Sequence, residues 1–170
     1  HAPPAARDVA LVFQNFSRYP GWSVRANLEV PLRAPGRALD AAEIERRVRA
    51  AAEKLAITHL LERDSRRLSG GEMQRVAIGR AIVRRPKLFL MDEPLTNLDA
   101  KLREALRVEL ASLVRDFGVP MVYVTHDQAE ALSMGDSIHV LAGGRILQSG
   151  APRAVDLRPA SPAVAPAHGA

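Results

Sequence analysis

The chain has 170 residues, of which 47% are hydrophobic and 25% are charged, with a formal net charge of +5 and a pI near 10.4. This length suffices for one globular domain with a real core, and the absence of cysteine excludes disulfides and thiolate metal sites. No apolar run approaches the roughly 18 residues that span a bilayer, and the opening HAPPAARDV lacks the apolar core of a signal peptide, so a soluble chain is expected.

The positive charge would suit nucleic acid or an anionic membrane surface. The arginines, however, lie beside acids in EIERRVR and ERDSRR, which is typical of solvated helix faces. Aromatic residues make up only 4% of the chain, too few for the stacking platform of a single-strand binder. Nucleic-acid binding is therefore a minor hypothesis.

The first predicted element is a buried strand over residues 9–13, VALVF, with Gln14 at its end. A loop rich in proline, glycine and aromatic residues follows. Residues 40–61 then predict a helix, because Asp40 and Glu43 have capping-box spacing and apolar residues recur at helical intervals.

Residues 68–75, LSGGEMQR, place two glycines in the first turn of the next predicted helix, where each costs roughly 0.5–1 kcal/mol relative to alanine. Ser69 and Glu72 have capping-box spacing, and the helix continues until the proline of RRPK. Because a helix N-terminus offers unpaired N–H groups, and glycine lets a phosphate reach them, Ser69, Gly70 and Gly71 are candidates to bind the terminal phosphate of a nucleotide. A capped helix with a tight entry turn is the alternative.

A continuous apolar run from Leu88 to Met91 predicts a strand covered on both faces, and Asp92 and Glu93 close it. A paired acid at the end of a buried strand suits magnesium-dependent nucleotide chemistry, because a hard cation prefers carboxylate oxygen and an attacking water needs a positioned base. Asp92 would hold the metal and Glu93 would orient the water. A plain strand-to-loop exit is the alternative for this dipeptide alone.

The segment after PLTNLD predicts a long helix that ends at Gly118. Residues 121–125, MVYVT, predict another buried strand, with His126 just beyond it. Asp127 and Glu130 have the spacing of a cap for a short helix. The segments IHVL and RILQSG around a Gly-Gly turn predict a terminal hairpin.

The alternation of strands and helices predicts an α/β fold with a mostly parallel sheet and helices packed on it. In such sheets ligands lie off the carboxyl ends of the strands. This rule selects Gln14, Asp92, Glu93 and His126, since each lies just past a predicted strand. For His126 alone, a phosphate contact and an ordinary hydrogen-bonded histidine remain open.

Five motifs in order carry a family resemblance. VFQN, LSGGEMQR, LFLMDEP, NLD and VTHD resemble the Q-loop, signature motif, Walker B strand, D-loop and H-loop of ATP-binding cassette (ABC) ATPases. The resemblance covers the chain from about Val9 to Gly150, and VFQNF, NLDAKLR, THDQAEALSMGD and GGRILQSGAP resemble the import subgroup that serves carbohydrates and related solutes. It implies a P-loop NTPase-like fold, with a helical subdomain at about residues 20–85.

The resemblance also implies roles for the strand-end residues. Gln14 would sense Mg²⁺ and the attacking water, and its loop would move with a neighbouring transport channel. Asp92 would serve the metal, Glu93 the catalytic water and His126 the γ-phosphate. ATP and Mg²⁺ are the implied cofactors.

A second set of implied roles concerns a head-to-tail dimer. Ser69, Gly70 and Gly71 would contact the γ-phosphate of ATP held by a second ABC ATPase subunit, in a homo- or heterodimer, and Asp99 would link the two sites. Further implied partners are transmembrane permease subunits and, indirectly, a solute-binding protein, with no nucleic acid. The implied location is cytoplasmic, peripheral on the inner face of the cell membrane.

The family places a phosphate loop, G-x-x-x-x-G-K-[ST], ahead of the Q-loop. The three lysines here lie in AAEKLA, RRPKLF and LDAKLR, and none follows a glycine. We therefore expect residues 1–150 to be a partial ABC ATPase domain without the first strands and phosphate loop, followed by a disordered Ala/Pro-rich tail over 151–170. Because phosphoryl transfer depends on positioning and charge stabilisation, the chain alone should bind ATP weakly and hydrolyse it negligibly.

Two other functions share these motifs. Cassette ATPases of DNA repair or chromosome maintenance commonly insert a coiled coil or zinc module between Q-loop and signature, whereas here Gln14 and Leu68 are close in sequence and cysteine is absent. This spacing favours transport. The other alternative is a non-catalytic remnant that offers its SGGE segment to the nucleotide of an intact partner.

Overall fold

The computed structural model describes residues 7–13, 19–36, 38–96, 100–162 and 164. The chain divides into two compact units, His1–Val124 and Thr125–Ala170, each of which is considered by itself. None of the helices in the described part of the chain combines the length and apolar character needed to cross a membrane.

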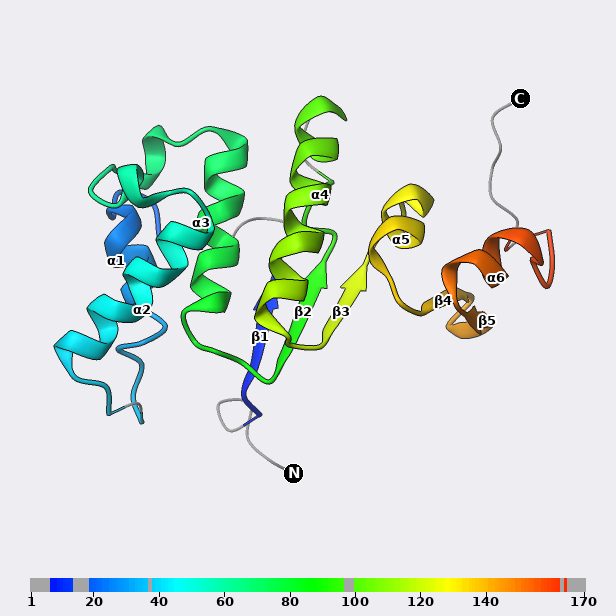
Figure 1. Cartoon of the computed structure of the whole chain (residues 1–170), viewed down its shortest axis with the longest axis horizontal. Helices are drawn as coiled ribbons and strands as arrows, with labels where there is room; N and C mark the ends of the chain where they lie inside the picture. Colours follow the sequence, from blue (N-terminus) through cyan, green and yellow to red (C-terminus); the bar gives the residue numbers. More distant parts are fainter. Residues whose placement is uncertain (1–6, 14–18, 37, 97–99, 163, 165–170) are drawn as a thin grey trace. The chain divides into compact units, whose positions relative to one another are not determined.

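A three-stranded parallel sheet forms the centre of the first unit (Figure 1). Its strands, in spatial order, are β1 (Val9–Val12), β2 (Leu88–Asp92) and β3 (Met121–Val124). Leu11 lies opposite Leu90, and Leu90 lies opposite Val122, so the apolar residues of the three strands are in register. The predicted α/β fold with parallel strands is confirmed.

Four helices accompany this sheet: α1 (Val24–Glu29), α2 (Ala41–Lys54), α3 (Gly70–Ile82) and α4 (Ala100–Phe117). Helices α1, α2 and α3 group beside β1, whereas α4 lies by β2 and β3 (Figure 1). At Gly79 in α3, a Cβ would lie 2.8 Å from Leu28 Cδ2 and 3.0 Å from Leu55 Cδ1. Glycine therefore permits the close approach of α3 to the helices beside it.

The helix predicted over residues 40–61 is shorter than expected. Asp40 caps it by accepting the Glu43 N–H at 2.7 Å, but the helix ends at Lys54. Ala56 has φ +53, a left-handed conformation that a regular helix does not contain, and a 3₁₀ turn at Thr58–Leu60 follows. The sequence after Lys54 has apolar residues at intervals that resemble those of a helix. These residues, Leu55, Ile57 and Leu60, are all buried although the backbone is no longer helical.

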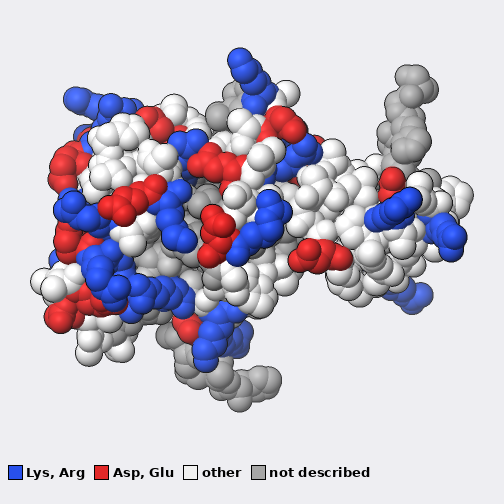
Figure 2. Space-filling view, viewed as in Figure 1, with Lys and Arg blue, Asp and Glu red and all other residues white. Residues whose placement is uncertain are grey.

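The arginines of α2 form the mixed solvated face that the sequence predicts. Arg47 pairs with Glu43 at 2.6 Å and Arg49 pairs with Glu45 at 3.0 Å, each one helical turn apart. In Figure 2 basic and acidic side chains are interleaved on the face that carries α2. The excess of positive charge on this helix therefore does not by itself indicate a nucleic-acid surface.

The prediction that β3 is a buried strand is wrong, and β2, predicted to be covered on both faces, is buried on one face and half-buried on the other. One face, which we term the covered face, carries the buried residues Ala10, Val12, Phe89 and Met91. The opposite face, termed the open face, leaves Leu11, Val122 and Val124 exposed by 45%, 50% and 51%. The helices of the first unit bury one side of the sheet, and the described part of this unit supplies no cover for the other.

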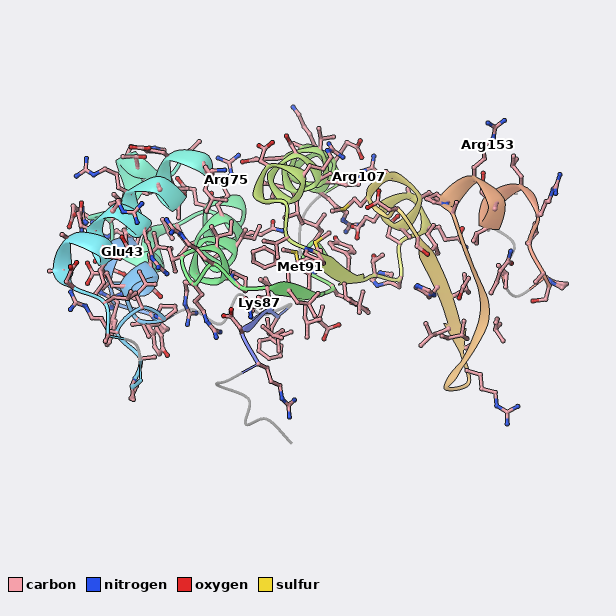
Figure 3. The ribbon with its side chains drawn as sticks, turned by 60° about the horizontal axis from the view of Figure 1, so that its bottom comes forward. Glu43, Arg75, Lys87, Met91, Arg107 and Arg153 are labelled. Atoms are coloured by element: carbon pink, nitrogen blue, oxygen red, sulfur yellow. The ribbon has the colours of Figure 1, made fainter. Side chains whose placement is uncertain are left out.

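Helix α4 contributes to the covered side. Leu106 and Leu110, from its predicted apolar side, are 4% and 2% exposed, and Met91 of β2 lies between the sheet and this helix (Figure 3). An ion pair of 2.7 Å between Arg75 of α3 and Glu109 of α4 joins the two helices. Helices α3 and α4 are therefore connected to each other on this side of the sheet.

The second unit consists of α5 (Gln128–Met134), β4 (Ile138–Ala142), β5 (Arg145–Gly150) and α6 (Pro152–Leu157). The predicted terminal hairpin is confirmed: β4 and β5 pair antiparallel, and Gly143 and Gly144 in the turn have φ +55 and +73. Both angles favour glycine. The expectation of disorder over 151–170 is wrong for α6, which has a proline in its first turn and buries Val155.

Candidate functional site

The two predicted acids lie where β2 ends. Asp92 is the last residue of the strand and is exposed to solvent. Glu93 follows with φ +46, a left-handed conformation that costs a non-glycine residue on the order of 1 kcal/mol. Its N–H donates to the Val124 carbonyl at 2.9 Å, and its Oε2 accepts the Thr96 hydroxyl at 3.1 Å. These bonds hold Glu93 at the carboxyl end of β2, between the strand and the following turn.

We term Asp92 and Glu93 the acidic turn. This turn could supply part of the ligand set of a magnesium ion whose other ligands are water and phosphate oxygens. The described residues contain no group of three or more histidine, cysteine or acidic side chains able to hold a metal. Magnesium is usually bound through one or two carboxylates together with water and substrate phosphates. The exposed Asp92 carboxylate meets that requirement, with Glu93 adjacent to it.

Helix α3 begins as the sequence predicts. Ser69 Oγ accepts the Glu72 N–H at 3.3 Å, and Glu72 Oε2 accepts the Ser69 N–H at 2.7 Å, so the capping box is complete. The hydrogen bond from the Ser69 backbone lowers the pKa of Glu72 and outweighs the opposing effect of burial, while Arg63 at 3.5 Å adds a smaller lowering.

The glycines of this turn leave donors available. The N–H groups of Gly70 and Gly71 make no hydrogen bond within the described residues, as expected for the first turn of a helix. Ser69 is exposed and Gly70 is half-buried. The capped-helix interpretation is therefore correct, and it leaves the Gly70 N–H beside an exposed serine, whereas Gly71 is buried.

A buried glutamine joins the two motifs, and the sequence reasoning missed it. Gln74 of α3 is 1% exposed, and its Nε2 donates to the Pro94 carbonyl at 3.1 Å, directly after Glu93. The signal that could have revealed it is a polar residue on the buried side of an amphipathic helix. This bond connects α3 to the residue that follows Glu93.

His126 lies in the second unit and is exposed. The backbone around it is fixed by a small network: Asp127 Oδ1 accepts the Glu130 N–H at 3.1 Å, and the Thr125 hydroxyl donates to the buried Glu130 carboxylate at 2.7 Å. The Asp127 N–H donates in turn to Thr125 Oγ1 at 3.0 Å. Glu93 belongs to the first unit, so the predicted location of both side chains at the same edge of the sheet stays a prediction.

Two further predicted site residues, Gln14 and Asp99, lie outside the described residues. Their predicted roles, at the end of β1 and ahead of α4, remain predictions.

Comparison with known proteins identifies the family. The model of the ABC transporter family matches residues 2–96, which include β1, the signature segment and the acidic turn. The chain belongs to the ABC transporter family. The resemblance predicted from the five motifs is thereby confirmed.

Individual relatives of this ABC chain are importer proteins by name. It is 53% identical over 163 residues to the trehalose/maltose import ATP-binding protein MalK of Thermococcus litoralis, covering 96% of this chain and 43% of that protein. It is 54% identical over 162 residues to the sn-glycerol-3-phosphate import ATP-binding protein UgpC of Cupriavidus pinatubonensis, covering 95% and 43%. A third relative, the diacetylchitobiose uptake system ATP-binding protein MsiK of Streptomyces coelicolor, is 51% identical over 161 residues, covering 95% and 42%.

A solved structure supports the P-loop NTPase-like fold. The cbiO1 protein of Clostridium perfringens, part of the ABC transporter complex cbiONQ, matches with a TM-score of 0.77 at 27% identity, covering 90% of this chain and 64% of that chain. The chain spans less than half the length of the curated relatives named above.

Proposed function

We propose that the chain is part of the ATP-binding and ATP-hydrolysing subunit of an importer that takes up a sugar or a similar small solute. The observation that carries this proposal is the linked arrangement of the acidic turn and the glycine-started helix. Three relatives at 51–54% identity that are named as import ATP-binding or uptake proteins support the transport assignment. They do not favour the alternative of a DNA-repair ATPase.

We assign the acidic turn to hydrolysis. Bound Mg²⁺ would neutralise phosphate charge and orient the phosphate oxygens. Asp92 would supply one carboxylate ligand, and Glu93 would accept a hydrogen bond from the attacking water. The left-handed backbone and the bond from Thr96 fix Glu93 before substrate arrives, which lowers the cost of positioning that water.

The start of α3 would act on nucleotide held by a second ABC ATPase subunit. Ser69 is exposed and Gly70 is half-buried at the start of the helix, so that the serine side chain and the Gly70 N–H could reach phosphate oxygens, and the buried Gly71 would allow their close approach. Asp99 would connect the two sites, and His126 would contact the γ-phosphate. In this arrangement each site needs residues from both subunits.

The loop that contains Gln14 would transmit this state to a permease. Phe13 and Tyr19, the described residues on either side of it in the sequence, line a groove of about 300 Å³ together with Arg80. Tyr19 stacks on Trp22 with centroids 5.2 Å apart, and the Arg80 guanidinium lies 4.9 Å from the centre of the Tyr19 ring. An aromatic and cationic surface of this kind suits a protein partner. The location proposed is the cytoplasmic face of the membrane, with a solute-binding protein as an indirect partner.

The phosphate loop expected from the family has no counterpart among the lysine-containing segments of this sequence. Titration of the purified chain with ATP and Mg²⁺ should therefore show binding weaker than micromolar and negligible release of phosphate. Micromolar affinity for the chain alone would contradict this expectation.

The second part of the experiment tests the shared site. The chain is mixed with an intact ABC ATPase subunit, and their association is measured with and without ATP. Association should increase with ATP, and Ser69→Arg should weaken the ATP-dependent part by roughly tenfold or more, since it removes a charge-assisted contact and adds bulk. Ser112→Arg, at an exposed serine of α4, is the matched control and should have no effect. Equal association for all three chains, with or without ATP, would exclude the proposed role of α3.

A further inference from the structure

A hollow of about 370 Å³ lies in the first unit between α2, the C-terminal end of α3 and the start of β2. Its floor is apolar and buried: Ala51, Ile82, Val83 and Phe89 are each exposed by 7% or less. A volume of this size is within the range of small-molecule sites, roughly 300–1,000 Å³. The hollow is separate from the acidic turn, because Phe89 is near the amino end of β2 and Asp92 is at its carboxyl end.

The rim of the hollow is cationic. Arg47, Lys54 and Arg85 line it, and no acidic side chain does. The carboxylate nearest in the ion-pair network, Glu43, accepts from Arg47 at 2.6 Å and lies 4.0 Å from Arg85, and it is also bonded to Arg46. Three arginines therefore share one carboxylate, so that the surface around the hollow retains positive charge.

One ordinary cause explains part of this pattern. The C-terminal ends of α2 and α3 carry partial negative charge, which favours cations in the last turns. It does not explain why the cations surround an apolar depression. Nor does it explain Arg85, whose φ of +51 places an arginine in a conformation that favours glycine.

We propose that this hollow binds a small amphipathic anion, with an apolar body on the floor and one carboxylate or phosphate group at the cationic rim. The apolar floor would remove the body of the ligand from water, and Arg85 with Lys54 would pair with its charge. The charge of the rim selects an anion over a neutral or cationic ligand of the same shape.

The position of the hollow lets such a ligand contact two parts of the first unit. Its walls come from α2 on one side and from Phe89 and Val119 of the sheet region on the other. A ligand that contacts both walls binds best when they have the separation seen here, and it stabilises that arrangement by mass action.

Three matched probes test the proposal on the full chain: decanoate, which has body and charge; decanol, which has the body alone; and acetate, which has the charge alone. Binding is followed by calorimetry and by backbone NMR shifts. Decanoate should saturate a single site and shift residues of the hollow, decanol should bind roughly tenfold more weakly, and acetate should not saturate.

Two variants and their controls locate the site. Lys54→Gln with Arg85→Gln should weaken decanoate binding by roughly tenfold, whereas Arg33→Gln with Arg49→Gln removes the same charge at exposed positions outside the hollow and should leave binding within about twofold. Ala50→Trp fills the hollow without changing charge and should abolish binding.

Several results would overturn the proposal. These are equal binding of decanoate and decanol, equal binding by the two charge variants, or NMR shifts confined to Leu11, Val122 and Val124 of the open face. Association with phosphatidylglycerol vesicles in the absence of binding to free decanoate would likewise replace the small-anion site by a membrane-surface contact.

Discussion

The covered and open faces of the three-stranded sheet carry similar apolar side chains but have different surroundings. Phe89 and Met91 of β2 are 2% exposed beneath the helices, whereas Leu11 of β1 and Val122 of β3 are half-exposed. Alternation along a strand assigns residues to faces, but only a packed element removes a face from water. The stability of the first unit should therefore come from one face, and the other is available for a partner or a further segment.

The largest effect should come from the covered face. Phe89→Ala removes a buried aromatic ring and should lower the free energy of unfolding by about 3–5 kcal/mol. Leu11→Ala, at a residue 45% exposed on the open face, should cost roughly 1 kcal/mol or less. A side chain that stays partly in water gains little hydrophobic stabilisation on folding, so its removal loses little. Denaturant unfolding of both variants measures the difference. Equal losses would mean that the open face is covered in solution.

A smaller effect should follow from crowding the helical layer on the covered side. Gly79→Ala places a methyl group against Leu28 and Leu55, which are fully buried and have little room to move. The strain of overpacking, about 1–3 kcal/mol, should exceed the gain in helix propensity of about 1 kcal/mol. Thermal unfolding should show a net loss.

The control for this variant is a double-mutant cycle. Leu28→Ala removes the side chain nearest the new methyl group. In that background, Gly79→Ala should be neutral or stabilising. If Gly79→Ala cost the same in both backgrounds, the close approach of α3 would not be what requires glycine there.

The next prediction concerns the stability of the exposed start of α3, which depends on hydrogen bonds and not on burial. Ser69→Ala removes the capping acceptor and should cost about 0.5–2 kcal/mol, measured by denaturant unfolding at neutral pH. Glycine at the same position should cost less, which distinguishes the cap from a loss of packing.

A second variant of this cap, Glu72→Gln, has a defined pH dependence because it removes the carboxylate that accepts the Ser69 N–H. Because the folded-state pKa of Glu72 is lowered, its contribution is present above the unfolded pKa and is lost as pH falls through the folded pKa. The difference in free energy of unfolding between the native chain and Glu72→Gln should therefore shrink as pH falls below about 4. A difference that grew in acid would show that the Ser69 backbone does not lower the pKa of Glu72.

Local signals in the sequence were sufficient for much of the fold. The capping pair Ser69 and Glu72, the apolar run of β2 and the Gly-Gly turn each fix nearby backbone, and the structure has all three. The end of α2 was misplaced because a left-handed alanine, Ala56, has no sequence signal of its own.

The site depended on information of a different kind. Asp92 and Glu93 were predictable because they follow a strand, whereas the bond from Gln74 to Pro94 joins residues that are distant in sequence. For Val122, alternation and apolarity alone do not distinguish an exposed from a buried position, since they are the same for covered and uncovered strands. Both the Gln74–Pro94 bond and the exposure of Val122 depend on how elements distant in sequence pack against one another.

The smallest effect on stability should come from making the open face polar. Val122→Thr with Val124→Thr keeps shape and β propensity while adding two hydroxyl groups at positions that are already about half exposed, so the free energy of unfolding should change by less than about 1 kcal/mol. Self-association, measured by sedimentation, should decrease, because an apolar face beside the terminal strand β3 promotes contact between chains. Val12→Thr, the same change at a residue 3% exposed on the covered face, is the matched control and should cost about 1–3 kcal/mol. A large loss of stability from the open-face pair alone would show that both sides of the sheet are packed, and the difference between the faces would not hold in solution.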